Sequence, residues 1–176
     1  MEEKKFPVVI AEDDIRRRVR ELAAEISRDY AGANPLLVSV LKGSVIFLAD
    51  PLRALSVPAQ VDFMAVTSYG GAGKKGGVVR IVKDLDLPIT GREVLVVEDI
   101  IDTGLTLAYL LRTLAAREPA SLQVCTLLDR RVRRIARLPV RYVGFEAPDL
   151  FLVGYGLDHQ EAHRNLPYLG SLPEGA

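Results

Sequence analysis

The sequence predicts an α/β fold in which a mostly parallel, twisted sheet is flanked by helices. Short apolar runs that suit buried strands alternate with segments in which apolar residues recur every three or four positions. Two of these runs, residues 36–41 and 94–97, are each followed by a turn and an amphipathic helix, the arrangement that joins parallel strands. Because ligands bind at the carboxyl ends of such strands, we expect the functional residues there.

Length and composition favour one compact domain. The chain has 176 residues, 49% of them hydrophobic, so we expect residues 1–176 to form a single domain around one sizeable core. Its 23 basic and 23 acidic residues balance, and no overall field attracts nucleic acid or a membrane surface. The N-terminus lacks an apolar signal core, and no apolar run approaches the roughly 20 residues that span a bilayer. We expect a cytoplasmic protein without nucleic-acid or membrane partners.

The first expected element is an N-terminal helix. It follows the cap-like Asp13 and Asp14 and ends before Gly32. Its apolar stripe, which should pack on the rest of the protein, consists of Ile15, Val19, Leu22, Ile26 and Tyr30.

A buried strand, a helix and a hairpin should follow. The strand occupies residues 36–41, and the helix runs from Ser44 to about Leu55. A strand at residues 61–66 then leads to residues 78–82, which we expect to pair back antiparallel. Between them, residues 70–77 contain glycines and no apolar side chain larger than alanine, so this stretch should be mobile and exposed.

The second half repeats the strand and helix pattern. After the strand at residues 94–97, a helical stripe is formed by Leu107, Leu110, Leu111 and Leu114. Residues 123–128 and 151–153 supply two more short strands. The only cysteine, Cys125, lies in the first of these apolar runs, so we expect it to be buried, and an internal disulfide or a multi-cysteine metal site is excluded.

Two adjacent carboxylates follow the apolar strand at residues 94–97. Helix capping explains Asp102 or Thr103, but it leaves Glu98 and Asp99 unexplained. Neighbouring carboxylates repel each other unless they meet cations or hydroxyl donors. We therefore interpret this strand-to-helix junction as a functional site.

The residues after the carboxylates suit an anion. Thr103, Gly104 and Thr106 offer backbone N–H groups and hydroxyls at a helix N-terminus, and the glycine permits close approach of a phosphate. No lysine follows the glycine, so the pattern differs from the P-loop of nucleoside triphosphatases.

Residues 94–107, Val-Leu-Val-Val-Glu-Asp-Ile-Ile-Asp-Thr-Gly-Leu-Thr-Leu, resemble the phosphoribosyl-pyrophosphate signature of the type I phosphoribosyltransferases, most closely the hypoxanthine-guanine branch. The likeness extends from about Leu37 to Leu172, with the motifs in the family's order. It implies the type I phosphoribosyltransferase fold, with a small hood built from terminal segments. It also implies a purine-salvage enzyme that uses Mg²⁺ and forms a homodimer or homotetramer. Such an enzyme transfers the 5-phosphoribosyl group from phosphoribosyl pyrophosphate to hypoxanthine or guanine, giving IMP or GMP and pyrophosphate.

The resemblance assigns roles to the signature residues. Glu98 and Asp99 would hold the ribose hydroxyls, directly or through Mg²⁺. Asp102 would face N7 of the purine as the general base, because a positioned carboxylate can accept the proton that leaves as the glycosidic bond forms. The 5-phosphate loop would consist of Asp102, Thr103, Gly104, Leu105 and Thr106.

The pyrophosphate loop and the lid are also assigned by resemblance. Lys42 and Gly43 match the family's pyrophosphate loop, although these residues taken alone favour a solvated turn, and Arg164 matches an arginine that binds the same anion. In the family, the Leu41–Lys42 bond is often cis. Ser68 and Tyr69 match the mobile lid, which would shield an oxocarbenium-like state from water; the alternative is an ordinary hairpin tip.

The purine pocket is expected in the last third of the chain. By resemblance, Phe151 stacks on the base, the Leu152 backbone reads its exocyclic edge, and Asp158 accepts from the guanine amino group or helps to hold a second Mg²⁺. Phe151 also fits a plain core position. Arg130 occupies the place of the family lysine that donates to O6, and this departure puts that role in doubt, because a guanidinium fork differs from an ammonium group.

Two alternatives remain open from the sequence. One is a regulator that senses the phosphoribosyl compound and binds nucleic acid, supported only by the arginine cluster at residues 130–141. The other is an enzyme of the same fold for xanthine, adenine or a pyrimidine.

Overall fold

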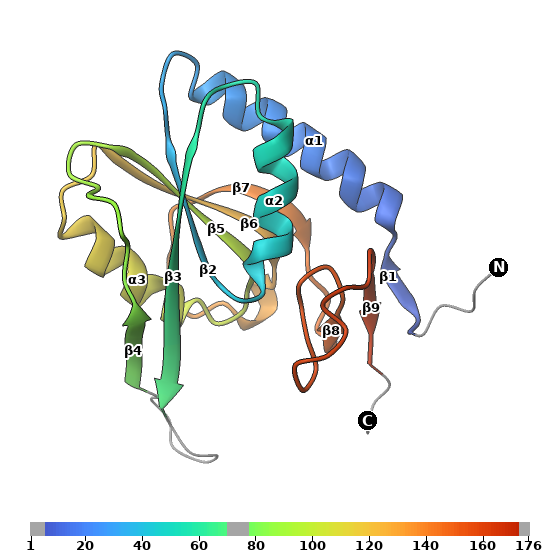
Figure 1. Ribbon diagram of the computed structural model, residues 1–176. Coiled ribbons are helices and arrows are strands. Elements are labelled where there is room, and N and C mark those ends of the chain that lie inside the picture. The colour runs from blue at the N-terminus through green and yellow to red at the C-terminus, as the bar shows by residue number, and fades with distance from the viewer. Residues whose placement is uncertain (1–5, 70–77, 173–176) are drawn as a thin grey trace.

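A computed structural model describes residues 6–69 and 78–172 of the chain (Figure 1). Its elements, in order, are β1 (Val8–Ile10), α1 (Glu12–Asp29), β2 (Leu36–Leu41), α2 (Ser44–Ala54), β3 (Gln60–Tyr69), β4 (Val78–Lys83), β5 (Glu93–Ile101), α3 (Leu105–Ala115), β6 (Ser121–Asp129), a 3₁₀ turn (Arg131–Arg133), β7 (Val140–Glu146), β8 (Leu152–Val153) and β9 (Leu169–Ser171). The glycine-rich residues 70–77, expected to be mobile, lie outside the described residues.

The main sheet has six strands in the order β4-β3-β2-β5-β6-β7. Strands β3, β2, β5, β6 and β7 run parallel, and β4 pairs antiparallel with β3 at one edge. The predicted α/β fold with a mostly parallel sheet is therefore confirmed, as is the antiparallel return after β3. Because the chain turns to opposite sides after β2 and β5, the carboxyl ends of these two neighbouring strands form the switch point at which such sheets bind ligands.

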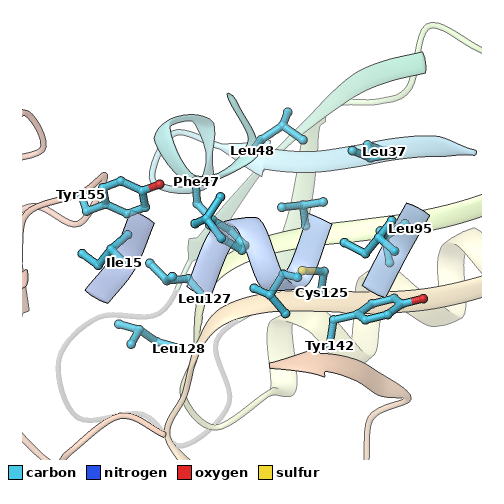
Figure 2. Close-up of a cluster of buried hydrophobic side chains, with 14 of the residues drawn as sticks. Ile15, Leu37, Phe47, Leu48, Leu95, Cys125, Leu127, Leu128, Tyr142 and Tyr155 are labelled. Carbon is cyan, nitrogen blue, oxygen red and sulfur yellow. The ribbon is translucent and has the colours of Figure 1, made fainter. Parts of the chain in front are cut away.

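Helices cover both faces of the main sheet (Figure 1). The stripe predicted for α1 is buried throughout, with Ile15 and Leu22 fully inaccessible, and it packs beside Phe47 of α2 on one face. Figure 2 shows this cluster, which includes the expected buried Cys125. On the other face, the predicted leucine stripe of α3 packs in a second cluster with Met64.

Alternation along the strands feeds the two clusters. In β5, Leu95 and Val97 join the α1–α2 cluster, whereas Val94 and Val96 join the α3 cluster. Parallel strands buried on both faces read as continuous apolar runs, and this explains the sequence signal at residues 94–97.

A second, three-stranded antiparallel sheet has the order β1-β9-β8 and joins the two terminal segments (Figure 1). Val8 pairs with Gly170, and Leu152 pairs with Ser171. The hood expected from terminal segments is thus present. It closely approaches the turn between β2 and α2, because a Cβ atom added at Gly156 would lie 2.1 Å from the carbonyl oxygen of Gly43.

Four details differ from the prediction. Helix α1 begins at Glu12 after Ala11, so Asp13 and Asp14 do not cap the helix but lie in its first turn. There their negative charges stabilise the helix by interacting with the positive end of its dipole. Strand β5 continues to Ile101, which places the two carboxylates inside the strand. The expected strand at residues 151–153 is reduced to β8 in the hood, and β7 was not foreseen. No helix among the described residues is long and apolar enough to cross a membrane.

Candidate active site

A cavity of about 280 Å³ lies at the carboxyl ends of β2 and β5. From β2 and its following turn it is lined by Val40, Leu41 and Gly43. The remainder of its wall is residues 98–104 with Thr106 and Leu107, which is the segment singled out in the sequence. The main polar site therefore occupies the switch point of the sheet.

Glu98 and Asp99 stand side by side in this cavity. Burial, with the neighbouring charge of Asp99 as a second cause, raises the pKa of Glu98 well above its ordinary value. Burial also raises the pKa of Asp99, although the N–H group of Ile100, which donates to its Oδ1 atom over 2.7 Å, works in the opposite direction. Two half-buried carboxylates without an ion-pair partner among the described residues favour a ligand with cations or hydroxyl donors.

The loop between β5 and α3 has the geometry of an anion cradle. Gly104 adopts φ = 79° directly before α3, and the Leu105 N–H group donates to the Thr103 hydroxyl oxygen over 3.4 Å. The loop is held from behind, because the N–H groups of Ile135 and Ala136 donate to the Thr103 carbonyl oxygen at 2.9 and 3.2 Å. It therefore presents the free N-terminus of α3 to the cavity in a fixed shape.

A second, mostly apolar cavity of about 190 Å³ adjoins the first. It is lined by Ile100, Asp102, Arg130, Phe151, Leu152, Leu157 and Asp158. All four residues expected to contact a purine are in this wall, and Asp102 lines both cavities. A carboxylate therefore lies where a ligand in the polar cavity meets one in the apolar cavity.

Arg130 is buried and closes one side of the apolar cavity. Its Nε and Nη2 atoms donate to the carbonyl oxygens of Pro148 and Leu150 at 3.2 and 2.6 Å. Its Nη1 atom lies 3.5 Å from Oδ1 of Asp102, which is buried and makes no hydrogen bond within the described chain. Arg133 reaches the other carboxylate oxygen of Asp102 at 3.9 Å and bonds Asp149 at 2.6 Å. The two guanidinium groups thus link Asp102 to the segment before Phe151.

The third part of the site lies where the hood meets the end of β2. The Leu41–Lys42 peptide bond is cis. Next to it, Gly43 approaches Asp99 so closely that an added Cβ atom would lie 1.8 Å from the Asp99 Oδ2 atom. Arg164 bonds Asp158 at 2.8 Å and the Gly156 carbonyl oxygen at 2.8 Å. The end of β2, the acidic pair of β5 and the hood therefore converge on one polar site.

Comparison with known proteins decides the family. The phosphoribosyl transferase domain family matches residues 11–160. The chain belongs to the phosphoribosyltransferase family.

Individual relatives narrow the assignment. The chain is 50% identical over 171 residues to the hypoxanthine-guanine phosphoribosyltransferase of Mycobacterium avium, covering 94% of this chain and 84% of that protein. Its Bacillus subtilis counterpart is 46% identical over 94% of this chain and 92% of its own length. A crystal structure of the Bacillus anthracis hypoxanthine-guanine enzyme superposes with a TM-score of 0.90 at 44% identity, covering 94% and 98% of the two chains. The predicted resemblance to the hypoxanthine-guanine branch is confirmed.

In this phosphoribosyltransferase, the residues expected to act together lie in the polar cavity, in the apolar cavity and where the hood meets the end of β2. The acidic pair and the loop at residues 102–106 are in the polar cavity, except that Leu105 points away and is 54% exposed. Ser68 and Tyr69 end β3, pairing with Val79 and Val78 of β4, and their side chains lie outside the described part of the structure.

Three residues that contact the candidate site were not singled out in the sequence. Arg133 had been grouped with a cationic cluster. Asp129, 5% exposed at the end of β6, forms an ion pair with Arg134 behind the loop between β5 and α3. Glu161 pairs with Lys42 at 3.1 Å. The positions of Asp129 after an apolar run and of Glu161 between two site residues were the available signals.

Proposed function

We propose that this phosphoribosyltransferase transfers the 5-phosphoribosyl group of phosphoribosyl pyrophosphate to hypoxanthine or guanine, giving IMP or GMP and pyrophosphate. The observation that carries the proposal is the shared position of Asp102 between a polar cavity and an apolar one. A sugar phosphate suits the first cavity and a flat base suits the second. The bond between them would form beside the carboxylate.

The polar cavity would hold the sugar phosphate. The 5-phosphate accepts from N–H groups and hydroxyls of residues 102–106 at the N-terminus of α3, whose dipole favours an anion. Glu98 and Asp99 hold the ribose hydroxyls. Their raised pKa values indicate that a hydroxyl donor or a cation would stabilise the charged form.

The apolar cavity would hold the purine. Phe151 is 57% exposed and stands at the rim, which suits a ring that stacks on a base and speaks against a plain core role. Leu152 offers its backbone to the exocyclic edge, and Asp158 accepts from the guanine amino group. Arg130 supplies the O6 donor: its Nε and Nη2 atoms donate to loop carbonyl oxygens, and Nη1 lies beside Asp102 in the cavity wall.

Asp102 would accept the purine proton. The N7 or N9 proton must leave as the glycosidic bond forms, and the Oδ1 atom of Asp102, which accepts no hydrogen bond in the described chain and lies 3.5 Å from Nη1 of Arg130, can receive it. Positioning and charge neutralisation would supply most of the remaining acceleration.

The pyrophosphate would be bound by Lys42, Gly43 and Arg164. Lys42 and Arg164 supply two positive charges for this multiply charged anion, and Gly43 lets the backbone approach it closely. Ser68 and Tyr69, at the end of β3, would close over the reaction as a lid and keep water from the oxocarbenium-like state.

Mg²⁺ is the proposed cofactor. The described residues contain no group of three or more potential metal ligands, but Mg²⁺ is commonly held by one or two carboxylates together with substrate oxygens. Glu98 and Asp99, and at a second position Asp158, fit that requirement. The ion would neutralise the diphosphate as it departs. A homodimer or homotetramer, which rests on the family resemblance, and the cytoplasmic location expected from the sequence complete the proposal.

The structure weakens the nucleic-acid alternative. Within the arginine cluster, Arg130, Arg131, Arg133, Arg134 and Arg141 each lie within ion-pair distance of an aspartate. A surface that binds nucleic acid needs unpaired Lys or Arg side chains, which neutralise the phosphates and so release the counterions of the nucleic acid. This cluster is mostly neutralised within the protein itself.

A spectrophotometric screen tests the function. The purified protein is mixed with phosphoribosyl pyrophosphate, Mg²⁺ and hypoxanthine, guanine, xanthine, adenine or uracil in turn. Turnover of hypoxanthine or guanine is expected, and omission of Mg²⁺ with added chelator should abolish it. Absence of turnover with both 6-oxopurines would refute the proposal, while preferential turnover of another base would support the same-fold alternative.

A further inference from the structure

The carboxylate of Glu161 lies between the two cations assigned to pyrophosphate. Its Oε2 atom is 3.1 Å from Nζ of Lys42 and 3.4 Å from Nη2 of Arg164. Lys42 follows β2 and Arg164 belongs to the hood, so one oxygen atom joins cations from two parts of the fold. A phosphate oxygen of a diphosphate would seek the same position.

The loop around Glu161 does not need this carboxylate for its shape. Glu161 adopts φ = 62°, a region that favours glycine, between Gln160 at 52° and His163 at 76°. The turn is closed by backbone bonds between His159 and Ala162, and the Glu161 N–H group donates to Asp158. A glutamate at a position that suits glycine, with its carboxylate on two site cations, indicates a role for the side chain.

We propose that Glu161 is an internal substitute for pyrophosphate: its carboxylate neutralises Lys42 and Arg164 and is displaced when the diphosphate of the substrate binds. This inference rests on the proposed function, because it takes both cations as the pyrophosphate site. Glu161 is therefore a positioning residue that sets the affinity of the site for its anion, and it contacts no reacting atom.

The exposure of the partners fits displacement. The side chains of Lys42 and Glu161 are 70% and 66% exposed, so water and salt weaken their attraction. Pyrophosphate carries several charges and can bind both cations at once, and it would outcompete a single carboxylate. Arg164 is only 26% exposed and keeps its bonds to Asp158 and the Gly156 carbonyl oxygen, so it stays in place when Glu161 leaves.

The same competition acts on the product. When the glycosidic bond has formed, pyrophosphate must leave two cations that attract it. Return of the Glu161 carboxylate to Lys42 and Arg164 lowers the free energy of the pyrophosphate-free state, so pyrophosphate binds more weakly, and weaker binding at one site mostly takes the form of faster dissociation. The Glu161 carboxylate therefore lowers the affinity for the substrate diphosphate and for product pyrophosphate alike, and it raises the turnover rate where pyrophosphate release is slow.

The Glu161→Gln variant tests this role. Binding of inorganic pyrophosphate in the presence of Mg²⁺ should tighten by about threefold to tenfold, because an exposed ion pair to each cation no longer competes. Product inhibition by pyrophosphate should strengthen to the same extent, and its release should slow in pre-steady-state measurements. The Glu161→Asp variant, whose side chain is one methylene shorter, should have a pyrophosphate affinity between those of the wild type and Glu161→Gln.

Two controls separate this role from a general charge effect. Glu21→Gln removes the same charge from α1, where Glu21 pairs with Arg18 at 2.9 Å, and should leave pyrophosphate affinity unchanged. In a Lys42→Met background, Glu161→Gln should gain clearly less affinity than in the wild type.

The outcomes distinguish this inference from the proposed function. One outcome would overturn the role of Glu161 alone: pyrophosphate binding to Glu161→Gln is unchanged or weaker, although thermal unfolding shows that the variant is folded and the wild type is active on 6-oxopurines. An equal gain with and without Lys42 would also overturn it. A wild type inactive on both 6-oxopurines would remove the proposed function on which the inference rests.

Discussion

The Nη1 atom of Arg130 lies 3.5 Å from the Oδ1 atom of Asp102 in the wall of the cavity that suits a purine. These two side chains come from the ends of neighbouring parallel strands, β6 and β5. One presents a donor for a carbonyl oxygen and the other an acceptor for a ring proton. A 6-oxopurine carries O6 and N7 on adjacent atoms of one edge, so the pair can bind both together.

Replacement of Asp102 by asparagine should mainly lower turnover. The amide keeps the size of the side chain but cannot accept a proton, and the loss of a general base typically costs about 10² to 10⁴ in rate. The KM values for both substrates should change by less than about threefold, because the proton transfer acts mainly in the transition state. Steady-state kinetics with hypoxanthine measures this. An unchanged kcat would remove Asp102 from the proton transfer.

Replacement of Arg130 should mainly affect the base. Arg130→Ala removes the O6 donor and two bonds to the loop before Phe151. Hydrogen bonds from charged donors contribute about 1.5–3 kcal/mol, so the KM for hypoxanthine should rise roughly tenfold to a hundredfold. The KM for phosphoribosyl pyrophosphate should change little.

Arg130→Lys separates the two functions of this residue. Lysine can still donate to O6, but it lacks the planar fork that bonds Pro148 and Leu150. Turnover should stay within about tenfold of the wild type, while the melting temperature drops. If the KM for hypoxanthine rises as much in Arg130→Lys as in Arg130→Ala, O6 recognition is not the main role of Arg130.

Cys125 should be chemically silent in the folded protein. Burial raises the pKa of its thiol to about 12 from an ordinary 9.0. The folded protein should therefore resist a thiol reagent at pH 8, and it should react fully once denatured. Rapid labelling of the native protein would contradict this burial.

The same thiol makes stability depend on alkaline pH. The unfolded thiol loses its proton from about pH 9 upward, whereas the folded thiol keeps it until about pH 12. Since the unfolded state binds fewer protons in this window, stability should fall as pH rises, by at most about 1.4 kcal/mol per unit. Denaturant unfolding at pH 8 to 10 should show a smaller decline for Cys125→Ala, since both proteins share the titration of all other groups.

Much of the fold followed from the sequence because periodicity reports burial. The five-residue stripe of α1 and the apolar runs of β2 and β5 were placed within a few residues. Strand β7 was missed because it lies at the edge of the sheet, directly after an arginine-rich turn, and only one of its residues, Tyr142, is buried, so its sequence lacks a continuous apolar run. The length of β5 was underestimated because Glu98 and Asp99 resemble loop residues, although both belong to the strand.

The contacts within the site were less accessible. The motifs located Asp102 and Arg130, but the engagement of Arg130 by two carbonyl oxygens depends on where the segment after β7 passes. Glu161 lies 119 residues from Lys42 in sequence, and only the docking of the hood onto β2 brings them together. Such pairings depend on tertiary arrangement, which a local pattern does not encode.

Gly43 carries the most stringent steric demand of the site. A Cβ atom there would lie 1.8 Å from Oδ2 and 2.9 Å from Cγ of Asp99. Asp99 has little room to yield, because it is half buried and its Oδ1 atom accepts from the Ile100 N–H group. Gly43→Ala should therefore displace the Asp99 carboxylate. Activity should fall by roughly tenfold to a hundredfold, since misplacing a binding group by about 1 Å can cost that much.

Gly32→Ala is the matched control for Gly43→Ala. Gly32 has φ = 78° and open space around it, so alanine should lower stability by about 1–2 kcal/mol without affecting the site. Asp99→Ala should add little further loss of activity to Gly43→Ala, because both changes remove the same carboxylate from its position. Steady-state kinetics at several Mg²⁺ concentrations and thermal unfolding of all four variants measure this. Additive losses in the double variant would show that Gly43 acts independently of Asp99.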